Sequence, residues 1–192
     1  MKTGFTLIEL LVVIAILAVL ATAVVLVLNP AELLKQGRDA TRVSDLAAIN
    51  SAISLWVADV NDTTTNWPAA TVKNCTYAVT LPTAGGSGCT INSVTAVNGV
   101  LAWVPLNLSL IISGSPISRY PIDPSNGSAT CSRGTPAVCE YAFTASTTVG
   151  VYELDAQLES TKFNTGGSGH LTDIDGGNDS NWCEMVSRLD LF

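Results

Sequence analysis

Positively charged side chains and histidine are scarce in this sequence. Its 192 residues include nine lysine and arginine residues and a single histidine, His170, against 16 aspartate and glutamate residues, and the net charge is −7. Proteins bind nucleic-acid phosphates mainly through lysine and arginine, so we expect no nucleic-acid binding by the bulk surface. A zinc site or a base-activated nucleophile would need more histidine, or a Cys-x-x-Cys pair, which the sequence lacks. We therefore expect no catalytic residues and no enzyme.

Charge is missing altogether from one long stretch near the N-terminus. Charged residues make up 13% of the chain, and none occurs between Leu10 and Leu28. About 20 apolar residues suffice for a helix to cross a bilayer. The acid Glu9 directly precedes this stretch, and a carboxylate there costs on the order of a few kcal/mol unless it has a partner. We therefore expect Glu9 to have a functional partner.

The residues around this acid form a known motif. Lys2 precedes Gly4, and Phe5-Thr6-Leu7-Ile8-Glu9 and the apolar run follow. This segment resembles the processing site of type IV pilins and of the pseudopilins of type II secretion systems. The resemblance implies that a prepilin peptidase cuts after Gly4 and methylates the new amine on Phe5. Since residues four apart share a helical face, the cut creates a cation one turn from Glu9. The resemblance also implies that Glu9 senses the Phe5 amine of the preceding subunit.

The resemblance carries expectations about function and location. It implies a structural subunit that waits in the cytoplasmic membrane and then enters a homo-oligomeric or mixed filament, a surface pilus or a periplasmic pseudopilus. An inner-membrane platform and an ATPase are the implied partners. An alternative is a minor pilin that binds a surface or DNA for uptake. The sequence also leaves open a cleaved secretory signal ending near residues 21–23, an ordinary membrane anchor, and an anchored exported hydrolase.

The segments after the apolar run predict a single head. We expect a leader at 1–4, a membrane or filament-core helix at 5–28, an amphipathic helix at 29–61 and a globular head at 62–192, with a kink at Pro30. The amphipathic helix has an apolar stripe. Its members are Leu46, Ile49, Ile53, Trp56, Val57 and Val60. The charged residues are expected on the other faces. These are Lys35, Arg38, Asp39, Arg42 and Asp45.

Beyond residue 70 the apolar pattern changes to a period of two, which indicates strands. We expect strands around 77–81 and 106–112, and a hairpin of 138–143 with 149–158. The fold class is α+β, with the long helix packed on a small antiparallel sheet. The turn at 120–126 and the aromatic segments after it resemble the heads of pilin-like proteins. In that turn Asp123 is expected to accept backbone hydrogen bonds. Glu153 and Glu159 are expected as exposed charges at strand ends.

All five cysteines follow the apolar run, which suggests an oxidising compartment. Their spacing favours the pairs Cys75–Cys89 and Cys131–Cys139 and leaves Cys183 over, although different connectivities remain open. The Gly-rich tail holds a candidate calcium site. Its oxygen donors are Asp173, Asp175, Asn178 and Asp179. Gly177 stands where an EF-hand would have its third ligand, and a solvated acidic turn is the alternative.

Overall fold

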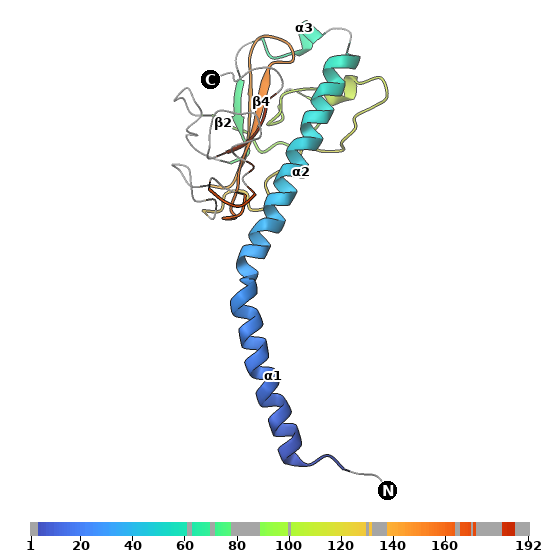
Figure 1. Ribbon diagram of the computed structural model, residues 1–192. Helices are drawn as coiled ribbons and strands as arrows, with labels where there is room; N and C mark the ends of the chain where they lie inside the picture. Colours follow the sequence, from blue (N-terminus) through green and yellow to red (C-terminus); the bar gives the residue numbers. More distant parts are fainter. Residues whose placement is uncertain are drawn as a thin grey trace. The chain divides into compact units, whose positions relative to one another are not determined.

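A computed structural model describes residues 4–60, 63–69, 72–77, 89–99, 101–129, 131, 138–163, 166–169, 171 and 182–186. At positions 26, 63, 64 and 182–186 it describes the backbone alone. The chain divides into two compact units, Met1–Lys35 and Gln36–Phe192 (Figure 1).

The chain is helical from Leu7 to Asp59, with one break. Helix α1 spans Leu7–Leu28 and helix α2 spans Pro30–Asp59. Between them Asn29 has a left-handed conformation with φ 40°. A proline is favourable in the first turn of a helix but lacks the N–H that the preceding turn would need, so a helix ends before it and another begins. The expected interruption at Pro30 is confirmed.

The apolar stripe of α2 forms one side of the core of the second unit. Leu46, Ile49, Ile53 and Trp56 are fully buried, and Val57 and Val60 pack at the edge of the same cluster. Their steps of three and four residues place them on one helical face, which packs on the sheet. The expected stripe is confirmed.

The sheet has five strands in the order β2-β1-β3-β4-β5. The strands are β1 (Val72–Cys75), β2 (Thr90–Ile91), β3 (Tyr141–Ala145), β4 (Tyr152–Gln157) and β5 (Trp182–Val186). Three neighbouring pairs are antiparallel, whereas β1 and β2 pair in parallel. The α+β class is confirmed, but the expectation of a purely antiparallel sheet is wrong at this edge. The Cys75–Cys89 disulfide joins the end of β1 to the residue before β2, which holds the two short strands side by side.

Strands β3 and β4 are the predicted aromatic hairpin. Phe143 lies opposite Leu154, and Tyr141 lies opposite Ala156. These residues and Tyr152 belong to the buried cluster that includes the stripe of α2. The Phe143 and Tyr152 rings stack with centroids 6.1 Å apart. Alternate residues of a strand face one side of the sheet, so the aromatic residues of both strands pack toward α2.

Two predicted strands are not found as such. At 106–112 the chain forms a short 3₁₀ helix, η1 (Leu108–Leu110), and not a strand. Leu106 and Leu108 are buried there, but Ile112 is 80% exposed, so the period-two pattern does not correspond to one buried strand face. Of the segment expected at 77–81 the structure describes only Tyr77, which lies in a bend after β1; the rest lies outside the described residues. The short helix α3 (Thr63–Asn66) precedes β1.

Candidate functional site

The predicted processing site lies outside helix α1. Gly4, Phe5 and Thr6 precede the first helical residue, and Thr6 caps the helix in an extended conformation, with φ −83° and ψ 150°. Phe5 is 79% exposed, and a Cβ added at Gly4 would meet no described atom within 4 Å. The peptide bond between Gly4 and Phe5 therefore lies outside the helix, between two exposed residues. Among the described residues, nothing packs closely enough at Gly4 to exclude a side chain there.

Glu9 is engaged by Thr6 in a capping box. The backbone N–H of Thr6 donates to Glu9 Oε2 over 2.9 Å, and the Thr6 hydroxyl donates to the same oxygen over 2.6 Å. In return the Glu9 N–H donates to Thr6 Oγ1 over 3.3 Å. This reciprocal arrangement satisfies two donors at the start of the helix. The acid that interrupts the apolar sequence thus has a local partner while the leader is attached.

Phe5 and Glu9 are not related by the helical spacing that the sequence predicts. The helix begins at Leu7, so Phe5 does not lie one helical turn before Glu9. The two residues nevertheless line one shallow recess, together with Ile8, Val12 and Val13. An amine created on Phe5 would therefore arise at the recess that Glu9 also lines, although the two residues are not related by helical spacing.

Helix α1 exposes apolar side chains on all of its sides. Its segment Leu7–Val25 has a mean hydropathy of 2.9, and it is long and apolar enough to cross a membrane. Val19 and Val27 are 70% and 82% exposed, and Leu7 is 81% exposed. The hydroxyl of Thr22 donates to the Ala18 carbonyl in the same helix, so it needs no outside partner. Such a surface requires either lipid or other apolar helices around it.

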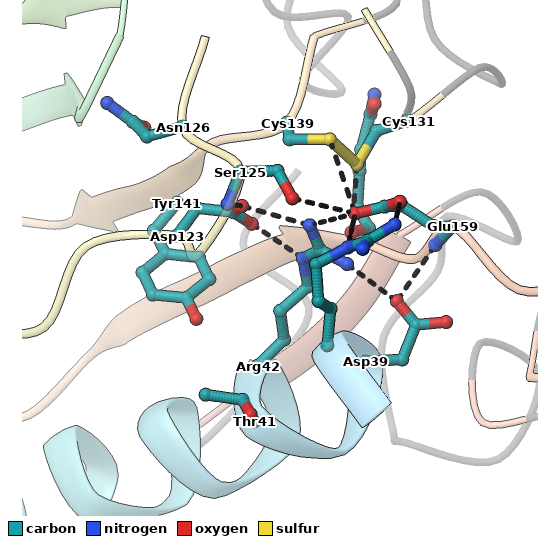
Figure 2. A network of polar contacts seen from close by, with 12 residues as sticks. Asp39, Thr41, Arg42, Asp123, Ser125, Asn126, Cys131, Cys139, Tyr141 and Glu159 are labelled. Carbon is teal, nitrogen blue, oxygen red and sulfur yellow. Dashed lines mark hydrogen bonds and ion pairs between the residues drawn. A yellow bond between two sulfur atoms is a disulfide. The ribbon is translucent and has the colours of Figure 1, made fainter. Parts of the chain in front are cut away.

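A second polar site lies inside the other unit, where α2 meets two loops (Figure 2). Arg42 is fully buried and lies between three carboxylates. Its Nε and Nη2 donate to Asp123 over 2.6 and 2.9 Å, its Nη1 to Asp39 over 2.7 Å, and Nη2 also to Glu159 over 2.6 Å. Arg38 adds a bond of 2.9 Å from its Nε to Glu159. Two positive and three negative side chains are thereby gathered in one network.

The network also ties backbone groups together. Asp39 accepts hydrogen bonds from the N–H groups of Glu159 and Ser160, over 2.9 and 2.8 Å. Asp123 accepts from the N–H of Ser125 over 2.7 Å, as expected for the turn that begins there. A buried charge is tolerated only when hydrogen bonds compensate its desolvation. The network therefore fixes α2 to the turn after residue 122 and to the chain that leaves β4.

The charges of this network shift its pKa values. Burial by itself would raise the pKa of Glu159, but hydrogen bonds from Arg38 and Arg42 outweigh it and lower the pKa to about 2. Burial by itself would lower the pKa of Arg42, but Asp123 and Glu159 raise it above its ordinary value. Both side chains are therefore charged across the whole neutral range.

The burial of these residues contradicts the sequence-based prediction. Asp39 and Arg42 are predicted on a solvent-facing side of the helix and Glu159 at an exposed strand end, yet all three are buried. One feature of the sequence does indicate that Asp39 and Arg42 are buried. Positions 39 and 42 continue the steps of three and four that define the stripe from Leu46 onward. The spacing therefore places both residues on the buried face of the helix, whereas their charged side chains favour an exposed position.

The Cys131–Cys139 disulfide packs against the network, and it is one of the two pairs that the spacing favours, both of which the structure contains. Sγ of Cys139 lies 3.9 Å from Glu159 Oε1. Cys131, Cys139 and Glu159 lie close enough to hold a metal ion. Both sulfurs are bonded to each other, however, and a metal would need thiolates. The site is therefore structural, and consists of a disulfide packed against a network of ion pairs.

The calcium candidates Asp173, Asp175, Asn178 and Asp179 lie outside the described residues, as does His170. Cys183 lies in β5, of which only the backbone is described. Trp56, Trp67 and Trp103 are buried, as expected for core residues.

Comparison with known proteins adds one finding. Residues 1–25 match the family described as "Prokaryotic N-terminal methylation motif". No curated protein and no solved structure matches the chain. The matched residues include Gly4 and Phe5, the capping box of Thr6 and Glu9, and most of α1. By these residues the chain carries the N-terminal methylation motif of the type IV pilin and pseudopilin family.

Proposed function

We propose that this protein is a structural subunit of a type IV pilus or of a secretion pseudopilus. In this proposal prepilin peptidase removes residues 1–4, the amine of Phe5 is methylated, and α1 enters the core of a filament. The observation that supports it is the 22-residue helix α1, which is apolar from Leu10 to Leu28 except for Thr22, is exposed at its described side chains, and is preceded by the accessible peptide bond of a methylation motif.

The energetics of α1 fit a transfer between lipid and protein. A helix satisfies its own backbone hydrogen bonds, so neither lipid nor a bundle of helices has to supply them. Lipid tails and neighbouring apolar helices are similar environments for its side chains, and exchange between the two is close to balanced. In the proposal the subunit waits in the cytoplasmic membrane, and an inner-membrane platform and an ATPase drive its extraction into the filament.

Glu9 would decide which contact forms after cleavage. Before the cut its carboxylate is held by the N–H and the hydroxyl of Thr6. The cut creates an amine on Phe5, and a charge-assisted pair is stronger than a hydrogen bond between a carboxylate and a neutral donor. In an apolar filament core the pairing of Glu9 with the Phe5 amine of a neighbouring subunit would fix the register between subunits.

The first test is the mass of the mature chain isolated from membranes. The proposal expects a chain that starts at Phe5 and carries one additional methyl group. A chain that starts after residue 23 would instead identify a cleaved secretory signal, and an intact N-terminus would identify a simple anchor.

The second test is Glu9→Ala in a strain that assembles the protein. We expect filaments to disappear while cleavage after Gly4 persists, because the cut site lies outside the helix that Glu9 caps. Thr6→Val is the matched control, since it removes the hydroxyl that binds Glu9 but keeps the carboxylate, and we expect it to form filaments. Normal filaments from the Glu9→Ala variant would contradict the proposal.

The alternative of a minor pilin that captures DNA or a surface has no specific support among the described residues. The net charge of −7 is unfavourable for contact with phosphates.

A further inference from the structure

A pocket lies in the second unit, at the end of the unit where α2 ends. It has a volume of about 560 Å³ and is lined by residues of α3, of the segment after α3, and of the loop before η1. Figure 1 shows α3 at this end of the unit. Pockets for small molecules have volumes of about 300–1,000 Å³, so this one is large enough to hold a ligand.

The pocket, here named the α3 pocket, combines apolar and polar side chains. Its lining residues include Asn66, Trp67, Pro68, Gly99, Pro105 and Asn107. None of the described residues that line it is charged. Both segments that contribute to it come from uncharged stretches of the sequence, since no charged residue occurs at 63–72 or at 74–118. In a chain with a net charge of −7, such a lining favours an uncharged ligand.

The aromatic wall of the α3 pocket is fixed by contacts with the core. The Trp67 ring packs against Trp56 and Tyr152, with ring centroids 5.9 and 6.2 Å away. Trp67 Nε1 donates to the Ser146 carbonyl over 2.7 Å, so its N–H is already bonded and the ring offers the pocket apolar surface only. Because the ring is held in place before a ligand arrives, little conformational freedom is lost on binding.

Asn107 gives the pocket a polar group whose position is also fixed. Its carbonyl accepts a hydrogen bond of 2.9 Å from Trp56 Nε1, and its side-chain oxygen accepts one of 3.0 Å from the Ser109 N–H at the start of η1. Nδ2 of the same amide has no acceptor among the described residues. An amide donor close to an apolar ring suits a ligand that has an apolar face and oxygen atoms at its edge.

We propose that the α3 pocket binds an uncharged saccharide. A sugar ring has apolar C–H faces that pack on aromatic and proline rings, and its hydroxyl groups accept hydrogen bonds from an amide. An extended peptide is less suitable, because peptides of this kind usually join an edge strand, and the strand at the pocket, β1, lies between β2 and β3 in the sheet. The inference goes beyond the proposed function, since it concerns the head and does not depend on assembly.

The test is a titration of the full-length chain, followed by backbone amide NMR. Micelles of a zwitterionic detergent are used, because a detergent with a sugar headgroup would compete for the pocket. The probes are the uncharged disaccharides maltose, cellobiose, lactose and N,N′-diacetylchitobiose. Chitobiose and sialyllactose are their charged counterparts, and acetyl-Ala-Pro-Ala-amide is an uncharged peptide. We expect at least one uncharged disaccharide to bind at millimolar concentration, with shifts concentrated at residues 65–69 and 98–107.

Two variants assign the binding to the α3 pocket. Asn107→Asp keeps the oxygen that binds the Ser109 N–H but replaces the donor with a negative charge, so we expect Kd to rise at least about tenfold. Gly99→Leu adds bulk to the lining at a position where an added Cβ would meet no described atom closer than 4.0 Å, and we expect a similar loss. Asn50→Asp is the matched control, because it makes the same change outside the pocket and keeps the acceptor for the Tyr152 hydroxyl. Its Kd should stay unchanged.

Several outcomes would overturn the inference. One is that none of the four disaccharides binds, and another is that a charged counterpart or the peptide binds in preference to them. Shifts centred elsewhere in the head would also overturn it, as would an equal loss of affinity in Asn50→Asp and Asn107→Asp. The amide spectrum away from the pocket checks that each variant is folded, and if Asn107→Asp is not, Gly99→Leu decides. Filament formation is not part of this test, so its failure is distinguishable from failure of the proposed function.

Discussion

Helices α1 and α2 place their charges in opposite ways. In α1 the apolar residues are exposed, and the single acid, Glu9, is satisfied by Thr6 only three residues away. In α2 the charged residues Asp39 and Arg42 are buried, and Arg42 is bound by Asp123 and Glu159, which are 81 and 117 residues away, as well as by Asp39. At a helix end the free backbone donors bind a carboxylate locally. In the middle of α2 Asp39 is a local partner of Arg42, but the other two carboxylates come from elsewhere in the fold.

This comparison predicts its largest effect at Arg42. Arg42→Met removes the buried cation and leaves three carboxylates without it, so we expect the free energy of unfolding to fall by about 3–5 kcal/mol. Arg38→Met is the control, because the Arg38 side chain is 35% exposed and binds one carboxylate of the network, Glu159, which keeps its contact with Arg42. For that pair the expected loss is about 0–1 kcal/mol. Urea unfolding of the full chain in detergent micelles, followed by tryptophan fluorescence, measures both.

Equal losses for Arg38→Met and Arg42→Met would contradict the view that burial sets the value of these ion pairs.

The pH dependence of stability gives a finer test of the same unit. The pKa of Glu159 is lowered to about 2, so its contribution is complete above the unfolded value of 4.5 and is lost as the pH falls from 4.5 toward 2. Glu140 behaves in the opposite way. Burial raises its pKa to about 8, so stability falls as the pH rises from 4.5 toward 8, because the unfolded chain releases this proton first.

Glu140→Gln separates the two groups. Glu140 is 1% exposed, and its Oε2 has no hydrogen-bond partner among the described residues. The neutral amide cannot ionise, so we expect the stability of the variant to become nearly independent of pH between 4.5 and 8. The loss of stability below pH 4.5, which is due to protonation of Glu159, should remain. Thermal unfolding at a series of pH values measures this. A slope above pH 4.5 that the variant leaves unchanged would assign that slope to another group.

The smallest predicted effect concerns the local partner of Glu9. Thr6→Ala removes the cap of α1, which costs about 1 kcal/mol at the helix start. We expect faster amide hydrogen exchange at residues 7–10 in micelles, with no change in the head. Thr22→Ala is the control, because the Thr22 hydroxyl bonds within the helix interior. Equal exchange in the two variants would show that the capping box does not hold the helix start.

Much of the fold follows from short stretches of sequence. The apolar run predicts α1, Pro30 predicts the interruption, and the steps from Leu46 to Trp56 predict the buried face of α2. These predictions need only the periodicity of one segment. The predicted strand at 106–112 is wrong because its pairing is limited to an isolated bridge between Asn107 and Asn98, and a 3₁₀ helix follows at once. Trp56 Nε1 donates to the Asn107 carbonyl, and Asp59 binds the N–H of Ile112, so contacts with α2 shape that segment.

The sequence by itself determined the methylation motif, the apolar helix with its single acid, and the spacing that defines one face of α2. Each of these depends on residues a few positions apart. Only the tertiary structure decided that Asp39, Arg42 and Glu159 lie inside. A buried charge needs a partner close in space, and for these residues that partner lies on a distant segment of the chain.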